Sequence, residues 1–255
     1  MKRQVTKLFL GVALSGLLML GSCHSSYELT KVEGRMIAID SVWDNRPDTR
    51  AMALLTPYKA KIDSMMYRVM GVSEMAMEKG HPESLLSNLV ADVIRESAVP
   101  VLGKPADMGL VNMGGLRNIL PEGEITCGAI YEILPFENSL CVVTLKGSSL
   151  RELFKNIAAK GGNGVSGIHL DINSDNELIE GTVGGALVED DKLYTVATID
   201  YLADGNDGME ALIQATTREC PPGATLRQIF MDYVDRQTAA GKKITSRLDG
   251  RVTVK

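Results

Sequence analysis

Histidine and aromatic residues are scarce in this chain of 255 residues, which has three histidines, one tryptophan and an aromatic content of 5%. His24, His81 and His169 stand far apart, and none lies in an Asp-x-His, Gly-Asn-His or His-x-His sequence. A pair of catalytic metal ions needs roughly six or more protein ligands on rigid loops. Three scattered histidines cannot supply that number, even with carboxylates. We therefore expect no cofactor and no metal centre in this chain.

Cysteine is also rare, and the four cysteines form no C-x-x-C pair, which argues against a zinc site. Beyond Cys23, the chain has Cys127, Cys141 and Cys220. A Cys127–Cys141 bridge is one arrangement if their strands pair, but we favour free buried thiols. There is no G-x-S-x-G sequence around a serine, and the glycine-rich segment 161–167 lacks the spacing and lysine of a phosphate-binding loop, so we interpret it as a turn.

Neither sign of charge dominates: 27 Lys and Arg stand against 32 Asp and Glu, for a net charge of −5. No basic cluster offers a surface that could follow a phosphate backbone, so nucleic-acid polymers are excluded as partners. With 45% hydrophobic residues, the chain suits one domain with a sizeable core behind an N-terminal leader.

The first 22 residues have the pattern of an export signal. Positive charges precede an apolar core from Leu8 to Leu20, which is too short to span a bilayer. Leu20-Gly-Ser-Cys23 resembles a bacterial lipobox, which predicts a lipid on Cys23 and attachment to a membrane. The expected location is the bacterial cell envelope, either facing the periplasm or exposed at the surface. An ordinary signal peptide cut nearby and an uncleaved anchor are the alternatives.

Residues 23–33 read as a polar tether, and residues 34–71 as a linker region with a helix. The alternating stretch from Val32 to Trp43 predicts a strand. Asp48 or Thr49 can cap a helix that runs to about Met66. We identify no chemistry in this region.

The remaining residues alternate between helical and strand patterns, which predicts an α+β fold. We expect a helix from Ser84, its N-cap, to about Ala98. Asn88 and Asp92 can support nearby loops, but we favour the exposed face of this helix for them. A second helix should follow Gly147, where Ser149 to Glu152 forms a capping box. Gly161-Gly162 should end the second helix. The pattern also predicts a last helix around 226–234 and strands at 109–111, 139–146, 167–172, 177–183, 193–198 and 251–254.

One stretch, Met108 to Gly147, carries the residues with functional potential. Gly114 and Gly115 let a strand end abruptly and aim Asn112 and Arg117 into a cleft. A proline then presents Phe136 on a rigid bend. An amide, a guanidinium and a held ring suit a flat, polar, negatively charged ligand. The alternative is a tight turn with a structural phenylalanine.

The order of these motifs resembles the C-terminal domain of 5′-nucleotidases, a family that includes UDP-sugar hydrolases and cyclic-nucleotide phosphodiesterases. The sequence has N-M-G-G-L-R from Asn112, P-E-G-E-I-T from Pro121, L-P-F from Leu134 and L-K-G-S-S-L from Leu145. A second block, Y-T-V-A-T-I-D-Y-L-A-D-G-N-D-G, begins at Tyr194. The resemblance covers 72–255 and implies a four-layer α/β/β/α arrangement.

The resemblance also implies a ligand site. Phe136 and Tyr201 would hold a nucleobase between their rings, and Asn112 would pair with the edge of the base. Arg117 would reach the ribose or phosphate, and Asp207 would accept hydrogen bonds from ribose hydroxyls. The other implied site residues, mainly glycines that shape the loops, are Gly114, Gly115, Asn138 and Gly205.

The sequence departs from the family at one point. The family usually has another arginine shortly before the first helix of this domain, where this chain has Lys79-Gly80-His81. A lysine is a point charge without the planar fork of a guanidinium, so we expect the contact to phosphate or ribose to be altered.

In this family, two metal ions held by a separate N-terminal domain carry out the hydrolysis. The resemblance therefore predicts the nucleotide-recognising half of a split 5′-nucleotidase, with divalent metals only in a separate metallophosphatase partner. One alternative is a non-catalytic module that binds nucleotides or nucleosides at the envelope. The other is an interaction protein that keeps only the fold.

Overall fold

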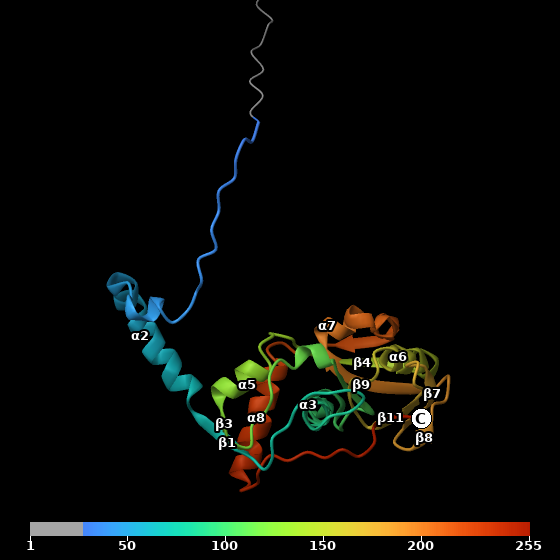
Figure 1. The fold of residues 1–255 in the computed structure, drawn as a ribbon. Coiled ribbons are helices and arrows are strands. Elements are labelled where there is room, and N and C mark those ends of the chain that lie inside the picture. Colours follow the sequence, from blue (N-terminus) through green and yellow to red (C-terminus); the bar gives the residue numbers. More distant parts are fainter. Residues whose placement is uncertain (1–27) are drawn as a thin grey trace, which may run out of the picture. The chain divides into compact units, whose positions relative to one another are not determined.

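The computed structural model describes residues 28–255 (Figure 1). The predicted export signal and lipidation at Cys23 lie outside the described residues, as does the first part of the predicted tether. The chain divides into two units; the described residues of the first are 28–52, and the second comprises residues 53–255. None of the described helices combines the length and the apolar character needed to cross a membrane.

The strand predicted from Val32 to Trp43 is wrong. Residues 28–42 form no strand, and their side chains are exposed; a short 3-10 helix, η1 (Trp43–Asn45), follows. An extended segment needs a neighbouring strand to pair its backbone groups, and this one has none. The predicted helix is confirmed as α2 (Thr49–Met66), and Asp48 Oδ1 accepts hydrogen bonds from the backbone of Arg50 and Ala51.

Residues 53–255 contain three sheets. A two-stranded antiparallel sheet pairs β1 (Val69–Ser73) with β3 (Gly123–Thr126). The five-stranded sheet has the order β10 (Thr217–Glu219), β4 (Leu140–Lys146), β9 (Leu193–Ile199), β2 (Met108–Val111) and β5 (Gly164–Ser166). The four-stranded sheet has the order β11 (Val252–Val254), β6 (Ile168–Ile172), β7 (Leu178–Val183) and β8 (Ala186–Leu187).

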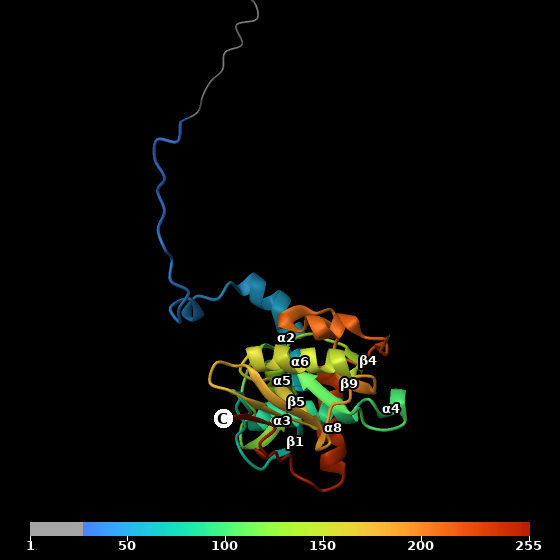
Figure 2. The same cartoon turned by 90° about the vertical axis from the view of Figure 1, so that its right-hand side faces the viewer.

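Helices pack on both larger sheets (Figure 2). Helix α3 (Leu85–Glu96) packs against β2 and β5, and α6 (Gly147–Ala159) contacts strands of both the five-stranded and the four-stranded sheet. Helix α8 (Leu226–Ala239) packs against α3, α5 (Cys127–Ile133) and β1. The shorter elements are α4 (Val99–Leu102), η2 (Met113–Gly115), α7 (Asp200–Ala203), η3 (Asn206–Gly208) and η4 (Glu210–Gln214). This mixture of helices and sheets confirms the α+β class.

Helix α3 confirms the predicted cap and corrects one prediction. Ser84 accepts a hydrogen bond from the Ser87 backbone, and the two serines form a capping box. Asn88, expected on the exposed face, is instead only 1% exposed, and its Nδ2 donates to Glu83 Oε1 and to the Arg247 carbonyl. Asp92 is half-buried and pairs with Arg251. The C-terminal loop that carries Arg247 and Arg251 covers this face of α3. Because that loop is remote in sequence, the local pattern assigned Asn88 to an exposed face.

Helix α6 begins without the predicted capping box. It starts at Gly147, and its first amides donate to backbone carbonyls of the 189–192 turn: Gly147 N to Lys192 O at 2.9 Å and Ser148 N to Asp190 O at 3.1 Å. Because these amides already have partners, no side-chain cap is needed. Ser149 Oγ donates to Gln214 Oε1 instead.

The cysteines also differ from the expectation of free buried thiols. Cys141 and Cys220 form a disulfide across 79 residues of sequence, while Cys127 is free and buried as expected. Strand β10 pairs antiparallel to β4, with Glu219 opposite Val142, so the next residue, Cys220, comes to lie beside Cys141. The sequence pattern did not reveal β10, and without that strand the bridge could not be predicted.

The register of the five-stranded sheet brings three distant loops together at one end of its central strands. Strand β2 runs parallel to β9, and β4 runs antiparallel to β9 with Leu140 opposite Ile199. The ends of β2 and β9 and the start of β4 therefore meet at the same level. The chain segments that follow Val111, precede Leu140 and follow Ile199 converge there.

Candidate functional site

A cavity of about 370 Å³ lies where these loops converge. Its volume is within the range of small-molecule pockets, about 300–1,000 Å³. It is lined by seven of the nine residues that the sequence predicted for the ligand site, namely Asn112, Gly114, Gly115, Phe136, Asn138, Tyr201 and Asp207. These residues span almost a hundred positions of sequence, and the sheet register described above unites them.

Two aromatic rings line the cavity from different loops. Phe136 lies on the bend between α5 and β4, and Tyr201 is the second residue of α7, directly after β9. Phe136 is 49% exposed and Tyr201 42% exposed. A large ring that the core leaves half uncovered retains a face on which a flat ligand can stack.

The carboxamide of Asn112 is buried with one atom unpaired. The residue is 7% exposed, and its Nδ2 donates to Asp207 Oδ2 at 3.0 Å. Its Oδ1 finds no hydrogen-bond partner among the described residues. A Cβ at Gly115 would come within 2.9 Å of this oxygen, so glycine leaves room for the amide. A buried acceptor without a partner costs about 1–3 kcal/mol, and a donor on a ligand would relieve that cost.

Asp207 is held in a conformation that few residues adopt. Its φ is 56°, in the left-handed region, and it lies between Gly205 at 83° and Gly208 at 77°. Its carboxylate accepts hydrogen bonds from Asn112 and, at 3.1 Å, from Lys160 Nζ. Backbone and side chain are therefore both fixed, with the carboxylate at the cavity wall. The sequence did not predict Lys160, which directly follows α6 and carries no local sign of this contact.

Arg227 of α8 holds the bend that carries Phe136. It is 6% exposed, and its Nη1 donates to the Leu134 carbonyl at 3.0 Å. Its guanidinium also pairs with Glu137 and lies 4.2 Å from the centroid of the Tyr131 ring. These contacts on both sides of the Pro135–Phe136 step hold the bend from which the Phe136 ring projects. Arg227 reaches this loop from far along the chain, and no sequence motif identified it.

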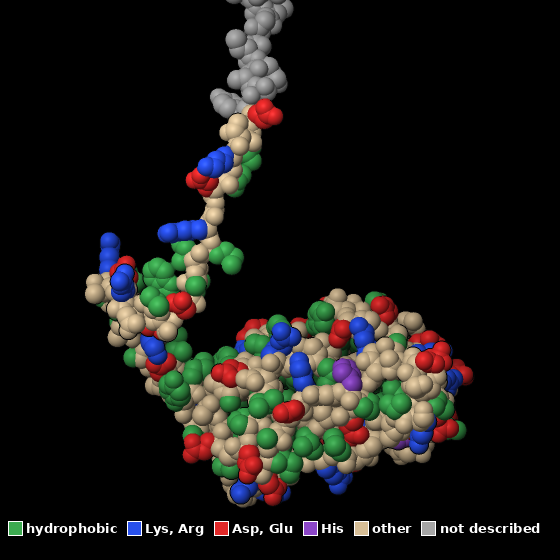
Figure 3. Space-filling model, in the orientation of Figure 1, with side chains coloured by type: hydrophobic (Ala, Val, Ile, Leu, Met, Phe, Trp, Pro, Cys, Tyr) green, Lys and Arg blue, Asp and Glu red, His purple; other side chains and the backbone are tan. Residues whose placement is uncertain are grey.

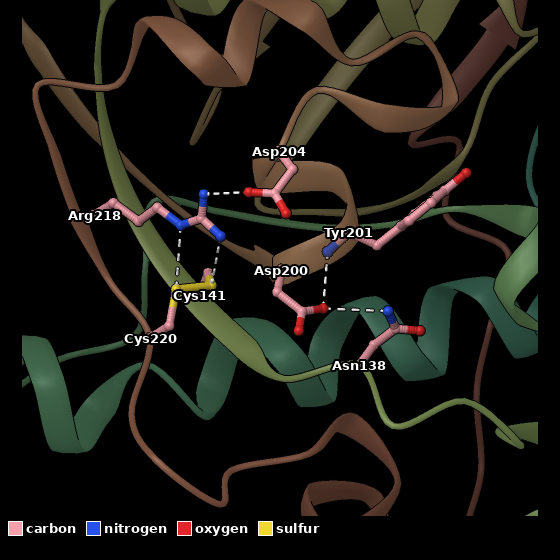
Figure 4. Close-up of a disulfide and its surroundings, with 7 residues drawn as sticks. All are labelled: Asn138, Cys141, Asp200, Tyr201, Asp204, Arg218 and Cys220. Atoms are coloured by element: carbon pink, nitrogen blue, oxygen red, sulfur yellow. Dashed lines mark hydrogen bonds and ion pairs between the residues drawn. A yellow bond between two sulfur atoms is a disulfide. The ribbon is translucent and has the colours of Figure 1, made fainter.

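A hydrogen-bond pair links the two sides of the cavity (Figure 4). Asn138 Nδ2 donates to Asp200 Oδ1 at 3.2 Å, and the same oxygen accepts the backbone amide of Tyr201 at 2.8 Å. The start of β4 is thereby joined to the start of α7. Asp200 was not among the predicted site residues.

Two predicted residues do not line the cavity. Arg117 is exposed, and its Nη1 donates to the Gly114 carbonyl at 3.2 Å, so it braces the loop. Gly205 lies behind the wall, where a Cβ would come within 2.5 Å of Ile213. The nine assignments as ligand contacts stay predictions.

The position of the expected arginine is occupied differently. Lys79 Nζ donates to the Leu116 carbonyl at 2.6 Å and lies 3.4 Å from the Met113 carbonyl, so its charge supports the loop after β2. Asn163 supports the same loop from the other side, since its Oδ1 accepts the Met113 amide. Neither side chain lines the cavity.

Within residues 28–255, no three His, Cys, Asp or Glu side chains gather closely enough to hold a metal ion. On the molecular face in Figure 3, acidic and basic side chains are interspersed.

Comparisons with known proteins agree with the fold. The sequence model of the family described as "5′-nucleotidase, C-terminal domain" matches residues 65–214. A trifunctional nucleotide phosphoesterase of Bacillus subtilis is 24% identical over 237 residues, which are 85% of this chain and 16% of that protein. A cell wall protein of Listeria monocytogenes is 29% identical over 189 residues, 68% of this chain and 24% of that protein.

A solved structure shows the same architecture. The crystal structure of a 5′-nucleotidase precursor from Thermus thermophilus superposes with a TM-score of 0.69 and 26% identity, over 81% of this chain and 43% of that one. This chain therefore spans less than half the length of each of these three relatives.

Proposed function

Because this chain belongs to the 5′-nucleotidase C-terminal domain family, we propose that it recognises a nucleotide or nucleoside in the cavity between Phe136 and Tyr201. We further propose that a separate metallophosphatase subunit carries out the hydrolysis of the phosphate ester. The observation that carries the proposal is the convergence of seven predicted ligand residues on one cavity of suitable size.

Each wall of the cavity suits one part of such a ligand. The half-exposed rings can stack on the two faces of a base, and stacking contributes about 1–3 kcal/mol per base with little preference among bases. The unpaired Asn112 Oδ1 can accept a hydrogen bond from an N–H or amino group on the edge of the base. The Asp207 carboxylate can accept from the ribose hydroxyls, since each oxygen has a further lone pair.

The phosphate side of the ligand has fewer partners. Lys79 is bonded to backbone carbonyls, and Arg117 points its Nη1 at Gly114. Lys160 is the cation bonded to the Asp207 carboxylate at the cavity wall. We therefore expect the affinity to come mainly from the base and ribose, so that a nucleoside and its monophosphate should bind with similar strength.

We place this activity in the bacterial cell envelope, with a lipid on Cys23. Two observations support an exported protein. The relatives include a cell wall protein, and the chain has a disulfide, a bond that persists mainly in oxidising compartments.

Titration calorimetry on the full chain without its leader tests the binding proposal. Adenosine, AMP and UMP are titrated into the wild type, into Phe136→Ala and into Tyr67→Ala. Tyr67 is 74% exposed and outside the cavity, so it controls for the loss of an exposed ring. Binding that Phe136→Ala weakens and Tyr67→Ala leaves unchanged supports the proposal. Equal affinities for all three proteins, or no binding of any nucleotide, contradict it.

The separate subunit is tested by mixing. The product of a neighbouring reading frame with Asp-x-His and Gly-Asn-His motifs is purified, and AMP hydrolysis is measured for each protein alone and for the mixture. The proposal requires hydrolysis that appears only in the mixture. If the neighbour is fully active alone, or if the mixture gains nothing although this chain binds AMP, the chain is a non-catalytic nucleotide-binding module.

A further inference from the structure

Strand β10 is a weak edge of the five-stranded sheet. It has only three residues, all exposed, and its one neighbour is β4. The Cys141–Cys220 disulfide closes its end, directly beside the last paired residues. Hydrogen bonds from Thr216 and Thr217 to Thr144 hold the start of β10 on β4, and the disulfide holds its end covalently. Because the strand is so short, we expect its end to depend on this covalent bond.

Arg218, the middle residue of β10, connects this edge to the wall of the ligand cavity (Figure 4). Its Nη1 donates to Asp204 Oδ1 at 2.6 Å. On the other side of the guanidinium, Nε donates to Cys220 Sγ at 3.3 Å and Nη2 to Cys141 Sγ at 3.8 Å. The disulfide and the carboxylate thus orient one side chain from two directions.

Asp204 occupies a sensitive position. It directly follows α7, which carries Tyr201, and precedes Gly205 and the left-handed Asp207. Beyond Arg218, the side-chain bonds that reach the 200–208 segment from other described residues come from Asn138, at its first residue, and from Asn112 and Lys160, at Asp207. Within the segment, Asn206 Nδ2 donates to the Tyr201 carbonyl at 2.9 Å. The bond to Asp204 fixes the middle of the segment, between its two cavity-lining residues.

We propose that Arg218, held by the Cys141–Cys220 disulfide, is a positioning residue for the ligand cavity, which fixes the 200–208 segment through Asp204. The proposed ligand rests on the function proposed above, whereas the fixed segment rests on geometry alone. The ion pair adds little to global stability, because Arg218 and Asp204 are 38% and 56% exposed. Its effect is to order the segment before the ligand arrives, which lowers the entropic cost of binding.

The disulfide makes this positioning sensitive to reduction. Two electrons and two protons from a dithiol such as dithiothreitol cleave the S–S bond to two thiols, and the dithiol is oxidised to its cyclic disulfide. Once the bridge is open, β10 can leave the sheet and carry Arg218 away from Asp204. We therefore expect reduction to weaken ligand binding through Arg218. Cys127, a buried free thiol, takes no part.

The test compares Arg218→Met, Arg218→Lys and Lys59→Met with the wild type in the full chain without its leader. Lys59 forms a similarly exposed ion pair, with Asp63 on α2, and serves as the matched control. Hydrogen exchange of the 200–208 amides reports on the segment without any ligand. Calorimetry with AMP, with and without dithiothreitol, reports on binding.

We expect faster exchange of the 200–208 amides in Arg218→Met, with a nearly unchanged melting temperature and a Kd for AMP raised about two- to tenfold, the cost of ordering one or two groups on binding. Arg218→Lys should recover part of both effects, and Lys59→Met should show neither. Dithiothreitol should weaken binding by the wild type but add nothing in Arg218→Met.

Exchange and affinity that stay at wild-type values in Arg218→Met overturn the positioning role. If dithiothreitol weakens AMP binding equally in the wild type and in Arg218→Met, the disulfide does not act through Arg218, and the proposed coupling is wrong. If the wild type binds no AMP, the proposed function fails, and the exchange of the 200–208 amides still decides whether Arg218 orders the segment.

Discussion

The ligand cavity and the charged cluster around Arg251 are both built from polar side chains brought together from distant segments, but in the cluster the charged groups pair with one another. Arg251 donates from Nη1 and Nη2 to the two oxygens of Asp92, at 2.7 and 2.9 Å, and from Nε to Asp249 at 2.7 Å. Ser166 Oγ donates to Asp92 as well. In the cavity, by contrast, Asn112 has an unpaired oxygen and two rings are half uncovered.

This difference distinguishes the charged cluster from the proposed binding site. In the cluster, burial alone would lower the pKa of Arg251, but its bonds to Asp92 and Asp249 outweigh burial and raise the pKa. The charges therefore satisfy one another and fasten the C-terminal strand to α3. In the cavity, the bonding capacity that the protein leaves unused is available to a ligand.

The largest effect that would sharpen this contrast is Arg251→Met. Removing the guanidinium leaves Asp92 without its cationic partner and Asp249 with Arg247 alone. We therefore expect a loss of about 3 kcal/mol in the free energy of unfolding, the low end for breaking a buried pair. Nucleotide affinity of the folded protein should not change. Urea unfolding and calorimetry measure the two quantities. Arg247→Met is the control, because its side chain is 82% exposed in the same cluster. A similar loss for both variants would mean that the cluster is not a structural unit.

Phe136→Ala should have the opposite profile. We expect nucleotide affinity to fall by about 1–3 kcal/mol, one lost stacking face, with little change in the melting temperature. Tyr201→Phe keeps its ring and should be nearly silent, because stacking does not use the hydroxyl. Calorimetry and melting curves distinguish the outcomes. If Phe136→Ala unfolds the domain while the remaining folded protein keeps its affinity, Phe136 is a structural residue of the bend.

Asp207→Asn should produce a smaller and more selective loss. Asparagine tolerates the left-handed backbone, so the fold of the loop should persist. We expect adenosine to lose about 1 kcal/mol of binding energy, one hydrogen bond, and 2′-deoxyadenosine to lose less, because it has one ribose hydroxyl fewer. Parallel titrations measure the difference. Equal losses for the two nucleosides would mean that Asp207 does not accept a hydrogen bond from the ribose 2′-hydroxyl.

The smallest effect depends on pH. Burial would raise the pKa of Asp249, but hydrogen bonds from Arg251, and less so from Arg247, lower it below its ordinary value. A carboxyl whose folded pKa is depressed stabilises the fold above its unfolded pKa, about 3.9, and loses that contribution as pH falls through the folded value. Asp249→Asn should therefore be less stable than wild type near pH 7, by less than about 1 kcal/mol, and indistinguishable at strongly acidic pH. If the difference in stability between Asp249→Asn and the wild type grows as the pH falls, the depressed pKa of Asp249 is wrong.

The sequence predicted those parts of the molecule that local patterns determine. Periodicity located α3 and β9, and glycine placed the turn after β2. The ordered motifs predicted seven residues that line one cavity. The sequence did not predict contacts between residues that are remote from each other in the chain. Strand β10 has no alternating pattern, so the Cys141–Cys220 bridge was missed. Arg227 and Lys160 act on loops outside their own neighbourhoods, and only the folded chain brings them there.

The register of β4 against β9 has a consequence for the lifetime of the protein. Asn138 and Tyr201 come from segments more than sixty residues apart, so the cavity exists only while these strands are paired. A nucleotide bound there acts as a reversible cross-link that the unfolded chain cannot hold. At a hundred times its Kd it would stabilise the folded state by about 2.7 kcal/mol. If the chain binds a nucleotide as proposed, its susceptibility to proteases would track nucleotide supply, and it would persist longest where nucleotide is abundant.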